Sequence, residues 1–343
     1  MAGRMNASPF WQRLSLKTFL PFLLLLVFLL FPGMGLSENL TRLFFITFVW
    51  MITGIAWNII GGFAGQVSFG FAVFYGLGAY AAALMINAGR NPFIALLAAA
   101  GTAILASFVV GLPTFRLRGP YFTIATIGVT EAVRVIMSNI SVTGGASGYR
   151  VNEFGPFRRF EHYYIALATV ALSVAISAVI ARSRFGLALR AIKQDEDAAA
   201  DVGVNPYRFK LWAHAIAAAL TGIAGGIYAR YAIFIEPGGV FAFNTGVSIL
   251  LMPVIGGIGT VWGPVLGGAV FGIVEEELVV NFPQIHLLLY GLLLILIILF
   301  EPDGLMGLLH RLFNLFRRRG EDSGGPGADK VLWRRSRLEG REL

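Results

Sequence analysis

Long apolar runs recur along almost the whole of the 343-residue chain, and short polar stretches separate them. A run of about 20 apolar residues is long enough to cross the hydrocarbon core of a bilayer as a helix. Glycine clusters interrupt the pattern near 61–70 and 256–264, so we expect broken or re-entrant segments there. The predicted fold is all-α, a polytopic integral membrane helical bundle of about ten spans. The expected spans are 18–36, 43–60, 66–88, 93–112, 120–140, 162–181, 211–235, 243–258, 262–280 and 286–300.

Composition supports a membrane protein without a soluble catalytic domain. Hydrophobic residues make up 57% of the chain and charged residues only 13%, so a water-soluble domain would have too little polar surface to cover its apolar side chains. The absence of cysteine excludes disulfides, thiolate metal sites and a cysteine nucleophile. The four histidines are too dispersed to form a metal-binding motif. We therefore expect this chain to bind no metal and no cofactor.

The basic residues indicate the orientation of the chain. They are scattered over loops and both ends, which argues against a nucleic-acid partner despite the net charge of +8. Lys and Arg accumulate on the cytoplasmic side of membrane proteins. With the N-terminus inside, 20 of the 27 Lys and Arg fall in inner segments and five in outer segments. We therefore expect a cytoplasmic segment 1–17, a transmembrane domain 18–300 with a cytoplasmic loop 182–210, and a basic, disordered cytoplasmic tail 301–343.

The first apolar run has a second interpretation, because Arg4, Arg13 and Lys17 precede it as they would precede a signal peptide. The run is long for the apolar region of a signal peptide, and the following "FPGMGLSEN" offers no A-x-A cleavage site. We therefore favour a retained span.

The loop "RAIKQDEDAAADVGVNPYRFK", residues 190–210, is charged and carries helix signals. Asp195 is a candidate N-cap, Glu196 and Asp197 place negative charge in a first turn, and Gly203 stands where a left-handed C-terminal residue belongs. A short helix is predicted here. A second one is predicted just before it, with Leu187, Ala191 and Ile192 available to rest on the membrane surface.

Two interpretations of the short helix remain open. It is either a solvated piece of a long loop or, because Ala198 to Ala200 give it small residues on a partly apolar face, a knob for a partner's groove.

Four stretches carry a family resemblance. "DAAADVG", residues 197–203, matches the E-A-A-x-x-x-G loop by which permeases of ABC importers dock onto their ATPase subunits, with Asp197 in place of the family's Glu. The wider "SRFGLALRAIKQDEDAAADVGVNP" resembles the permease subunit of branched-chain amino acid ABC transporters. So do "NIIGGFAGQVSFGFAVFYGLGAYAAAL" at 58–84, "PVIGGIGTVWGPVLGGAVFGIVEEEL" at 253–278 and "EPDGLMGL" at 301–308. The resemblance covers roughly residues 40–310.

The resemblance implies a set of partners. These are a homologous second permease, two ATPase subunits that carry ATP and Mg, and an extracytoplasmic amino-acid-binding protein, all at the plasma (inner) membrane of a bacterium. No Walker sequence G-x-x-x-x-G-K-[ST] occurs in the chain, so we expect it not to be an enzyme. The residues that the resemblance implies for ATPase coupling are Asp195, Glu196, Asp197, Ala198, Ala199 and Gly203.

The glycine clusters are candidates for the solute path, because unwound helices expose backbone donors and acceptors to a polar solute near the membrane middle. Small residues at every fourth position, such as Gly222 with Gly226 and Gly268 with Gly272, favour close helix packing instead. The candidate path residues are Gly61, Gly62, Gly65, Gln66, Ser68, Gly256, Gly257, Gly259 and Thr260.

Charges within or beside the spans are costly unless they pair or reach the interface. Glu131 and Arg134 are three apart on one predicted helix, so we expect a local ion pair. Arg230 and the 275–277 run of Glu lie toward outer span ends, where they either snorkel or help to form the mouth on which the binding protein lands, and we favour snorkelling. The outer loop with Arg150, Arg158 and Arg159 is either a docking surface for an acidic partner or a solvated loop.

Three classes of function are weighed. The leading one is a permease for uptake of branched-chain amino acids, with urea, short amides or other amino acids as alternative solutes in the same family. An autonomous secondary transporter or channel is the second class. A membrane-embedded enzyme is disfavoured because the chain lacks H-E-x-x-H and G-x-S-x-G.

Overall fold

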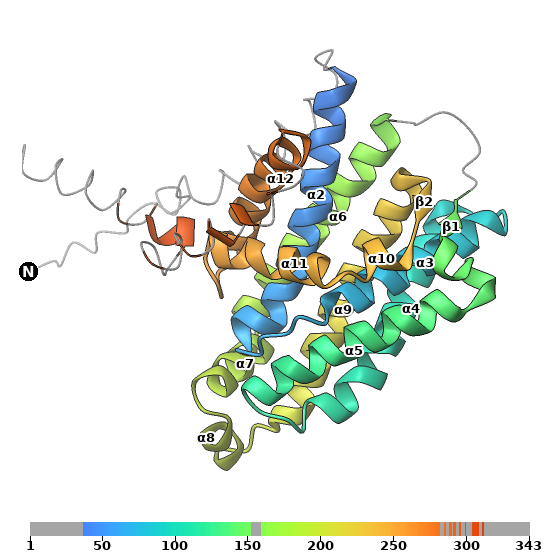
Figure 1. Ribbon diagram of the computed structural model, residues 1–343. Coiled ribbons are helices and arrows are strands. Elements are labelled where there is room, and N and C mark those ends of the chain that lie inside the picture. Colours follow the sequence, from blue (N-terminus) through green and yellow to red (C-terminus); the bar gives the residue numbers. More distant parts are fainter. Residues whose placement is uncertain are drawn as a thin grey trace, which may run out of the picture.

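A computed structural model describes residues 37–151 and 159–281, together with a few positions between 285 and 311 (Figure 1). The predicted span 18–36 and Arg158 lie outside the described residues, as do most of 286–300 and the tail after 311. The other eight predicted spans each contain a helix, so the polytopic all-α architecture is confirmed over this part of the chain.

Long helices make up most of the fold. They are α2 (Glu38–Asn58), α3 (Phe71–Asn87), α4 (Pro92–Thr114), α5 (Pro120–Asn139), α6 (Arg159–Arg182), α9 (Pro206–Ala232), α11 (Phe243–Gly256) and α12 (Gly263–Asn281). The short elements are α7 (Arg184–Gln194), α8 (Glu196–Asp201), α10 (Pro237–Val240) and two-residue strands β1 (Tyr149–Arg150) and β2 (Phe234–Ile235). Among the described residues, six helical segments are long and apolar enough to cross a membrane, and the apolar helices at Phe71–Asn87 and Gly263–Glu275 are shorter.

Local signals explain where several helices begin. Ser37 caps α2, and its hydroxyl oxygen accepts a hydrogen bond from the Leu40 amide. Asn91 and Asn205 cap α4 and α9, and each is followed by a proline whose missing N–H would be unsatisfied at that position in any case. The helix starts are therefore readable from the sequence.

The two ends of the bundle differ. One end holds α7 and α8, and is called the α8 end here (Figure 1). The opposite end holds the β1–β2 pair, in which Tyr149 lies opposite Ile235. There the Asn87 side chain at the end of α3 donates to the Arg150 carbonyl over 2.8 Å. The end of α3 and the segment that follows α9 therefore lie together at this opposite end.

Close helix packing accounts for several glycines. A Cβ on Gly225 of α9 would lie 2.0 Å from the Tyr75 carbonyl oxygen of α3, and one on Gly222 would lie 2.5 Å from the Ala103 Cβ of α4. Gly268 and Gly272 of α12 press against α2 in the same way. The prediction that repeated small residues serve packing is confirmed at these positions.

Two of the charge predictions have different outcomes. The Glu131–Arg134 pair is present, with the Arg134 Nε 2.9 Å from Glu131 Oε2. Snorkelling of Arg230 is wrong, because its guanidinium lies 2.8 Å from Glu161 Oε1 on α6 and the residue is buried. A carboxylate 69 residues away in sequence meets the charge instead.

The prediction that Leu187, Ala191 and Ile192 rest on the membrane surface is wrong in part. Leu187 is exposed, but Ile192 is buried inside the protein, together with Leu189. Ser183 caps α7 by accepting from the Gly186 amide over 3.1 Å, and this fixes the direction in which α7 leaves α6. The inner face of α7 therefore packs on the bundle.

Candidate functional site

The predicted short helix is confirmed as α8. The Asp195 carboxylate accepts hydrogen bonds from the Asp197 and Ala198 amides, both over 2.9 Å. After the helix, Gly203 adopts φ +89, and its amide donates to the Ala200 carbonyl. A side chain at Gly203 would be strained in this left-handed conformation. One acidic cap and one glycine therefore set both ends of α8.

Two long-range ion pairs hold α8 against the bundle. Arg118, in the α4–α5 connection, binds the Asp197 carboxylate through two parallel hydrogen bonds of 2.9 Å each. On the other side, Lys210 Nζ lies 2.8 Å from Glu196 Oε1, and the Lys210 side chain is completely buried. Its ammonium also lies 5.7 Å from the centre of the Phe115 ring. The helix is thus tied both to the α4–α5 connection and to α9.

The two pairs differ in their electrostatics. The Arg118–Asp197 pair is exposed, and the hydrogen bond and charge of Arg118 hold the pKa of the Asp197 carboxyl below its usual range. The Lys210 ammonium is shielded from water and depends on Glu196 for its charge partner. Sequence reasoning missed both basic residues, because no local pattern links Arg118 to a carboxylate 79 positions away.

The three alanines of α8 differ in exposure. Ala199 is buried against the protein, whereas Ala198 and Ala200 are exposed. Val202, just after the helix, is 79% exposed. The outward face is therefore small and partly apolar, and of the three alanines only Ala198 and Ala200 are open to a partner.

The two glycine clusters meet each other although about 200 positions separate them. The Asn58 side chain donates to the Thr260 carbonyl and accepts from the Gly259 amide, each over 2.8 Å. The chain is unwound at both places, as predicted: a π-helical turn at Ile59–Phe63 follows α2, and α11 ends at Gly256. One buried asparagine thus joins two breaks in the helical bundle.

This junction lies toward the α8 end of the bundle, next to α7. Lys193, at the end of α7, donates from Nζ to the Gly62 carbonyl over 2.9 Å. A Cβ built on Gly259 would lie 3.1 Å from the Gly62 oxygen, and Gly259 has φ +79. The junction is therefore directly connected to the segment that carries α8.

The remaining candidate path residues share this neighbourhood but differ in exposure. Gly61, Gly256 and Gly257 are buried, Gly65 is exposed and Gln66 is half-buried. Ser68 is buried, and its carbonyl accepts from the Trp57 indole over 2.7 Å. The structure therefore brings buried and exposed candidate residues together in one neighbourhood.

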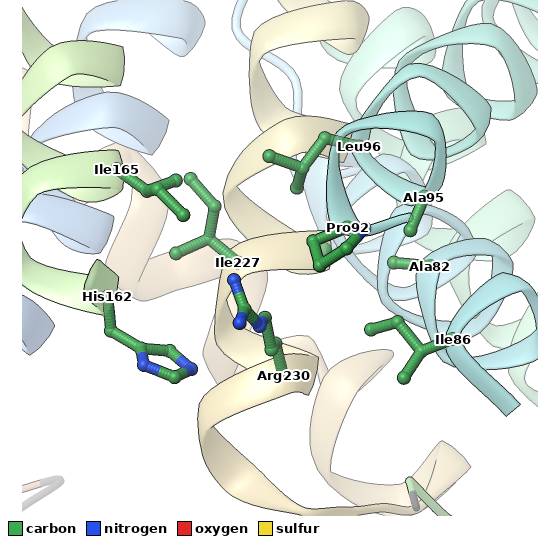
Figure 2. Close-up of a pocket in the computed structure, with 10 residues that line it drawn as sticks. Ala82, Ile86, Pro92, Ala95, Leu96, His162, Ile165, Ile227 and Arg230 are labelled. Carbon is green, nitrogen blue, oxygen red and sulfur yellow. The ribbon is translucent and has the colours of Figure 1, made fainter. Parts of the chain in front are cut away.

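A small pocket lies between α9, α6 and the α3–α4 pair (Figure 2). Figure 2 shows the Arg230 side chain reaching between His162 and the apolar Ile86 and Pro92. The pocket has a volume of about 10 Å³, which is close to the minimum for a single water molecule. This pocket has no room for a solute.

Within the described residues, no group of three or more His, Cys, Asp or Glu side chains is arranged to hold a metal ion.

Comparison with known proteins places the chain among transport permeases. A family model described as "Branched-chain amino acid transport system / permease component" matches residues 39–298. The permease protein LivM of the high-affinity branched-chain amino acid transport system of Escherichia coli K12 is 30% identical over 292 residues, covering 76% of this chain and 68% of LivM. LivH of the same strain is 25% identical over 281 residues, covering 75% of this chain and 90% of LivH. A probable LivM of Methanocaldococcus jannaschii is 27% identical, covering 63% of this chain and 70% of that protein. No solved structure matches the chain.

Proposed function

Because the chain belongs to the family of branched-chain amino acid transport permeases, we propose that it forms part of the membrane path of an ABC importer for branched-chain amino acids. Both LivM and LivH resemble it, which supports a complex of two related permease chains. ATP hydrolysis then belongs to two separate ATPase subunits that hold ATP and Mg, and an extracytoplasmic binding protein delivers the solute.

The observation that carries the proposal is the anchored, outward-facing α8. Isolated propensity cannot stabilise a six-residue helix, yet α8 is capped at both ends and held by Arg118 and Lys210. Such anchoring suits an element that receives force from a partner. Ala198, Ala200 and Gly203 supply the contact surface, Asp195 and Ala199 support it from behind, and Glu196 and Asp197 hold it to the bundle.

We propose that α7 passes this force to the glycine junction. Only Asp195 separates α7 from α8, so the two short helices move together. Lys193 then connects α7 to the Gly62 carbonyl. Asn58, one helical turn before Gly62, is hydrogen-bonded to Gly259 and Thr260. The candidate path residues of both clusters act here as the closed inner end of the path, and movement of α7 opens it.

This assignment sets the orientation of the chain. The α8 end is cytoplasmic, both termini are on the same side as α8, and the protein spans the inner membrane of a bacterium. The excess of Lys and Arg in the segments on that side supports the orientation. The chain itself performs no catalysis.

Reconstitution tests the proposal. The two permeases, the ATPase subunits and the binding protein are placed in vesicles, and uptake of leucine, isoleucine, valine, urea and acetamide is measured with and without ATP. We expect ATP-dependent uptake of the branched-chain amino acids. Uptake that persists without the ATPase subunits and collapses with the ion gradient would instead identify an autonomous secondary transporter.

A matched pair of variants tests α8 itself. Gly203→Val places a β-branched residue at φ +89, a strain of about 1–2 kcal/mol, and should lower ATP-dependent uptake at least about tenfold without preventing membrane insertion. Gly89→Val is the control, because Gly89 also has a positive φ, +71, and an added Cβ would meet no atom within 4 Å, but it lies between α3 and α4, away from α8. Normal uptake by Gly203→Val would remove α8 from the mechanism.

A further inference from the structure

A large hollow lies toward the opposite end of the bundle. Two cavities of about 340 Å³ and 220 Å³ share Trp50, Tyr75 and Tyr228 in their walls, so they are two parts of one space, called the aromatic hollow here. Each part is several times the roughly 30 Å³ that one water molecule occupies in the liquid. The aromatic hollow therefore has room for a small organic solute.

The aromatic hollow reaches from the surface toward the middle of the bundle. Arg42 in the first turns of α2 and Trp50 further along the same helix both line it. These positions are eight residues apart, about 12 Å along a helix. Its walls come from α2, α3, α9 and α12, and the segment 234–245 closes one side. The space enters the bundle from the end that lies away from α8.

Aromatic faces form its floor. The Trp50 and Tyr75 rings are stacked with their centres 6.5 Å apart, and Tyr228 lies 5.7 Å from Tyr75. Such faces bind apolar side chains and also attract cations. The floor therefore accepts both an aliphatic group and an ammonium group.

Three ionisable side chains complete the lining. Glu236 lines the larger part, while Glu275 and Arg42 line the smaller part. Carboxylates recognise an ammonium group and a guanidinium recognises a carboxylate. Glu275 comes from the apolar helix α12, and ionisable residues on membrane-spanning helices are costly and mark solute paths. The charges of both signs match those of a zwitterion.

We infer that the aromatic hollow is the entry site of the permease and that it selects α-amino acids with apolar side chains over neutral amides. This inference rests on the proposed function. A neutral amide or urea fits the same space but supplies neither an ammonium group for the carboxylates nor a carboxylate for the guanidinium, and sites built to recognise a polar group discriminate strongly against ligands that lack it. A zwitterionic amino acid satisfies both signs and places its aliphatic group on the rings.

The inference is tested by measuring how far leucine protects a single introduced cysteine from chemical labelling. The chain contains no cysteine of its own, so only the introduced one reacts. Thr245 lines the larger part of the aromatic hollow. In the complete transporter in vesicles, millimolar leucine should slow maleimide labelling of Thr245→Cys several-fold, whereas isovaleramide and urea should not. Labelling of Val202→Cys at the α8 end reports any non-specific effect and should not respond to leucine.

Adding Glu275→Gln to the Thr245→Cys variant should raise the leucine concentration needed for half protection at least about tenfold. Glu131→Gln is the matched control, since this carboxylate pairs with Arg134 on α5, and it should leave protection unchanged. Conversely, ATP-driven leucine uptake without protection at any leucine concentration overturns the entry site but leaves the proposed function in place. Equal protection by isovaleramide overturns the ligand class, and the absence of ATP-driven uptake overturns both.

Discussion

The two ends of the bundle are built from different interactions. At the α8 end, a buried lysine, a buried asparagine and a second lysine bind carboxylate or backbone oxygens at 2.8–2.9 Å. At the opposite end, one stacked and one tilted pair of rings have centres 6.5 and 5.7 Å apart, beside a hollow lined by Arg42, Glu236 and Glu275. Short polar contacts transmit displacement between segments, whereas spaced rings leave room for a solute. Under the proposed function, force enters at the α8 end and solute at the opposite end.

This comparison predicts a separation of effects. Substitutions at the α8 end should lower ATP-driven uptake while the protection of Thr245→Cys by leucine remains. Substitutions in the aromatic hollow should remove protection while ATPase assembly remains. The predictions below test the α8 end in order of expected effect.

The largest effect is expected from Lys210→Met. This variant removes the fully buried Lys210 ammonium, which lies 2.8 Å from Glu196 Oε1. Breaking such an ion pair lowers the free energy of unfolding by about 3 kcal/mol. We expect a lower melting temperature of the purified complex and loss of coupled uptake. The double variant Lys210→Met/Glu196→Gln removes the stranded charge and should recover part of the melting temperature. An unchanged melting temperature in the single variant would contradict the anchoring role.

Gly259→Val should have the next largest effect. The backbone at Gly259 has φ +79, and the new Cβ would lie 3.1 Å from the Gly62 carbonyl oxygen, so the strain is about 2 kcal/mol. We expect uptake to fall roughly tenfold. The control is Gly101→Val on α4, where a Cβ meets no atom within 4 Å. Equal uptake by both variants would mean that transport does not require the close approach of Gly259 to Gly62.

Lys193→Met should weaken the connection between α7 and the glycine junction. It removes a charged donor to the Gly62 carbonyl, a hydrogen bond worth about 1.5 kcal/mol. ATP hydrolysis by the assembled transporter should continue while uptake per ATP falls several-fold. Lys193→Arg keeps a charged donor and should retain more of the coupling. If Lys193→Met transports with full efficiency, force reaches the path by another route.

The smallest effect is expected from Arg118→Gln, because the Arg118–Asp197 pair is exposed. Uptake should change less than about twofold. The pKa of Asp197 is lowered by Arg118, so the stabilising contribution is complete above the ordinary Asp pKa and is lost as the pH falls through the lowered value. Hydrogen exchange of the α8 amides should therefore be faster in Arg118→Gln at pH 6, with the difference vanishing in acid. A difference in hydrogen exchange between the two proteins that persists well below about pH 3 would show that it does not come from the charge of Asp197.

Local features of this chain were predictable from its sequence. Asp195 and Gly203 bracket α8 within nine positions, and capping rules apply over that range. The helix breaks near 61–70 and 256–264 follow from clustered glycine in apolar sequence, and the structure confirms both. Periodicity and caps act between near neighbours, so one sequence is enough to find them.

Long-range pairing was not predictable. Arg230 meets Glu161 across 69 positions and Asn58 meets Thr260 across 202. No periodic pattern specifies such pairs, and the expectation of snorkelling at Arg230 was wrong for that reason. The aromatic hollow escaped detection likewise, because Trp50, Tyr75 and Tyr228 come from three helices. The location of the path residues at the α8 end also depends on a tertiary contact, that of Lys193.

Crosslinking tests the central claim, contact between α8 and an ATPase subunit, most directly. Ala200→Cys places a thiol on the exposed face of α8 and Ala199→Cys on its buried face, while Arg42→Cys places one at the opposite end. With a short bifunctional reagent, we predict that Ala200→Cys captures the ATPase subunit, that Ala199→Cys reacts poorly, and that Arg42→Cys captures no ATPase subunit. Capture of the ATPase subunit through Arg42→Cys, or labelling of Ala200→Cys from the extracytoplasmic side, would contradict the account.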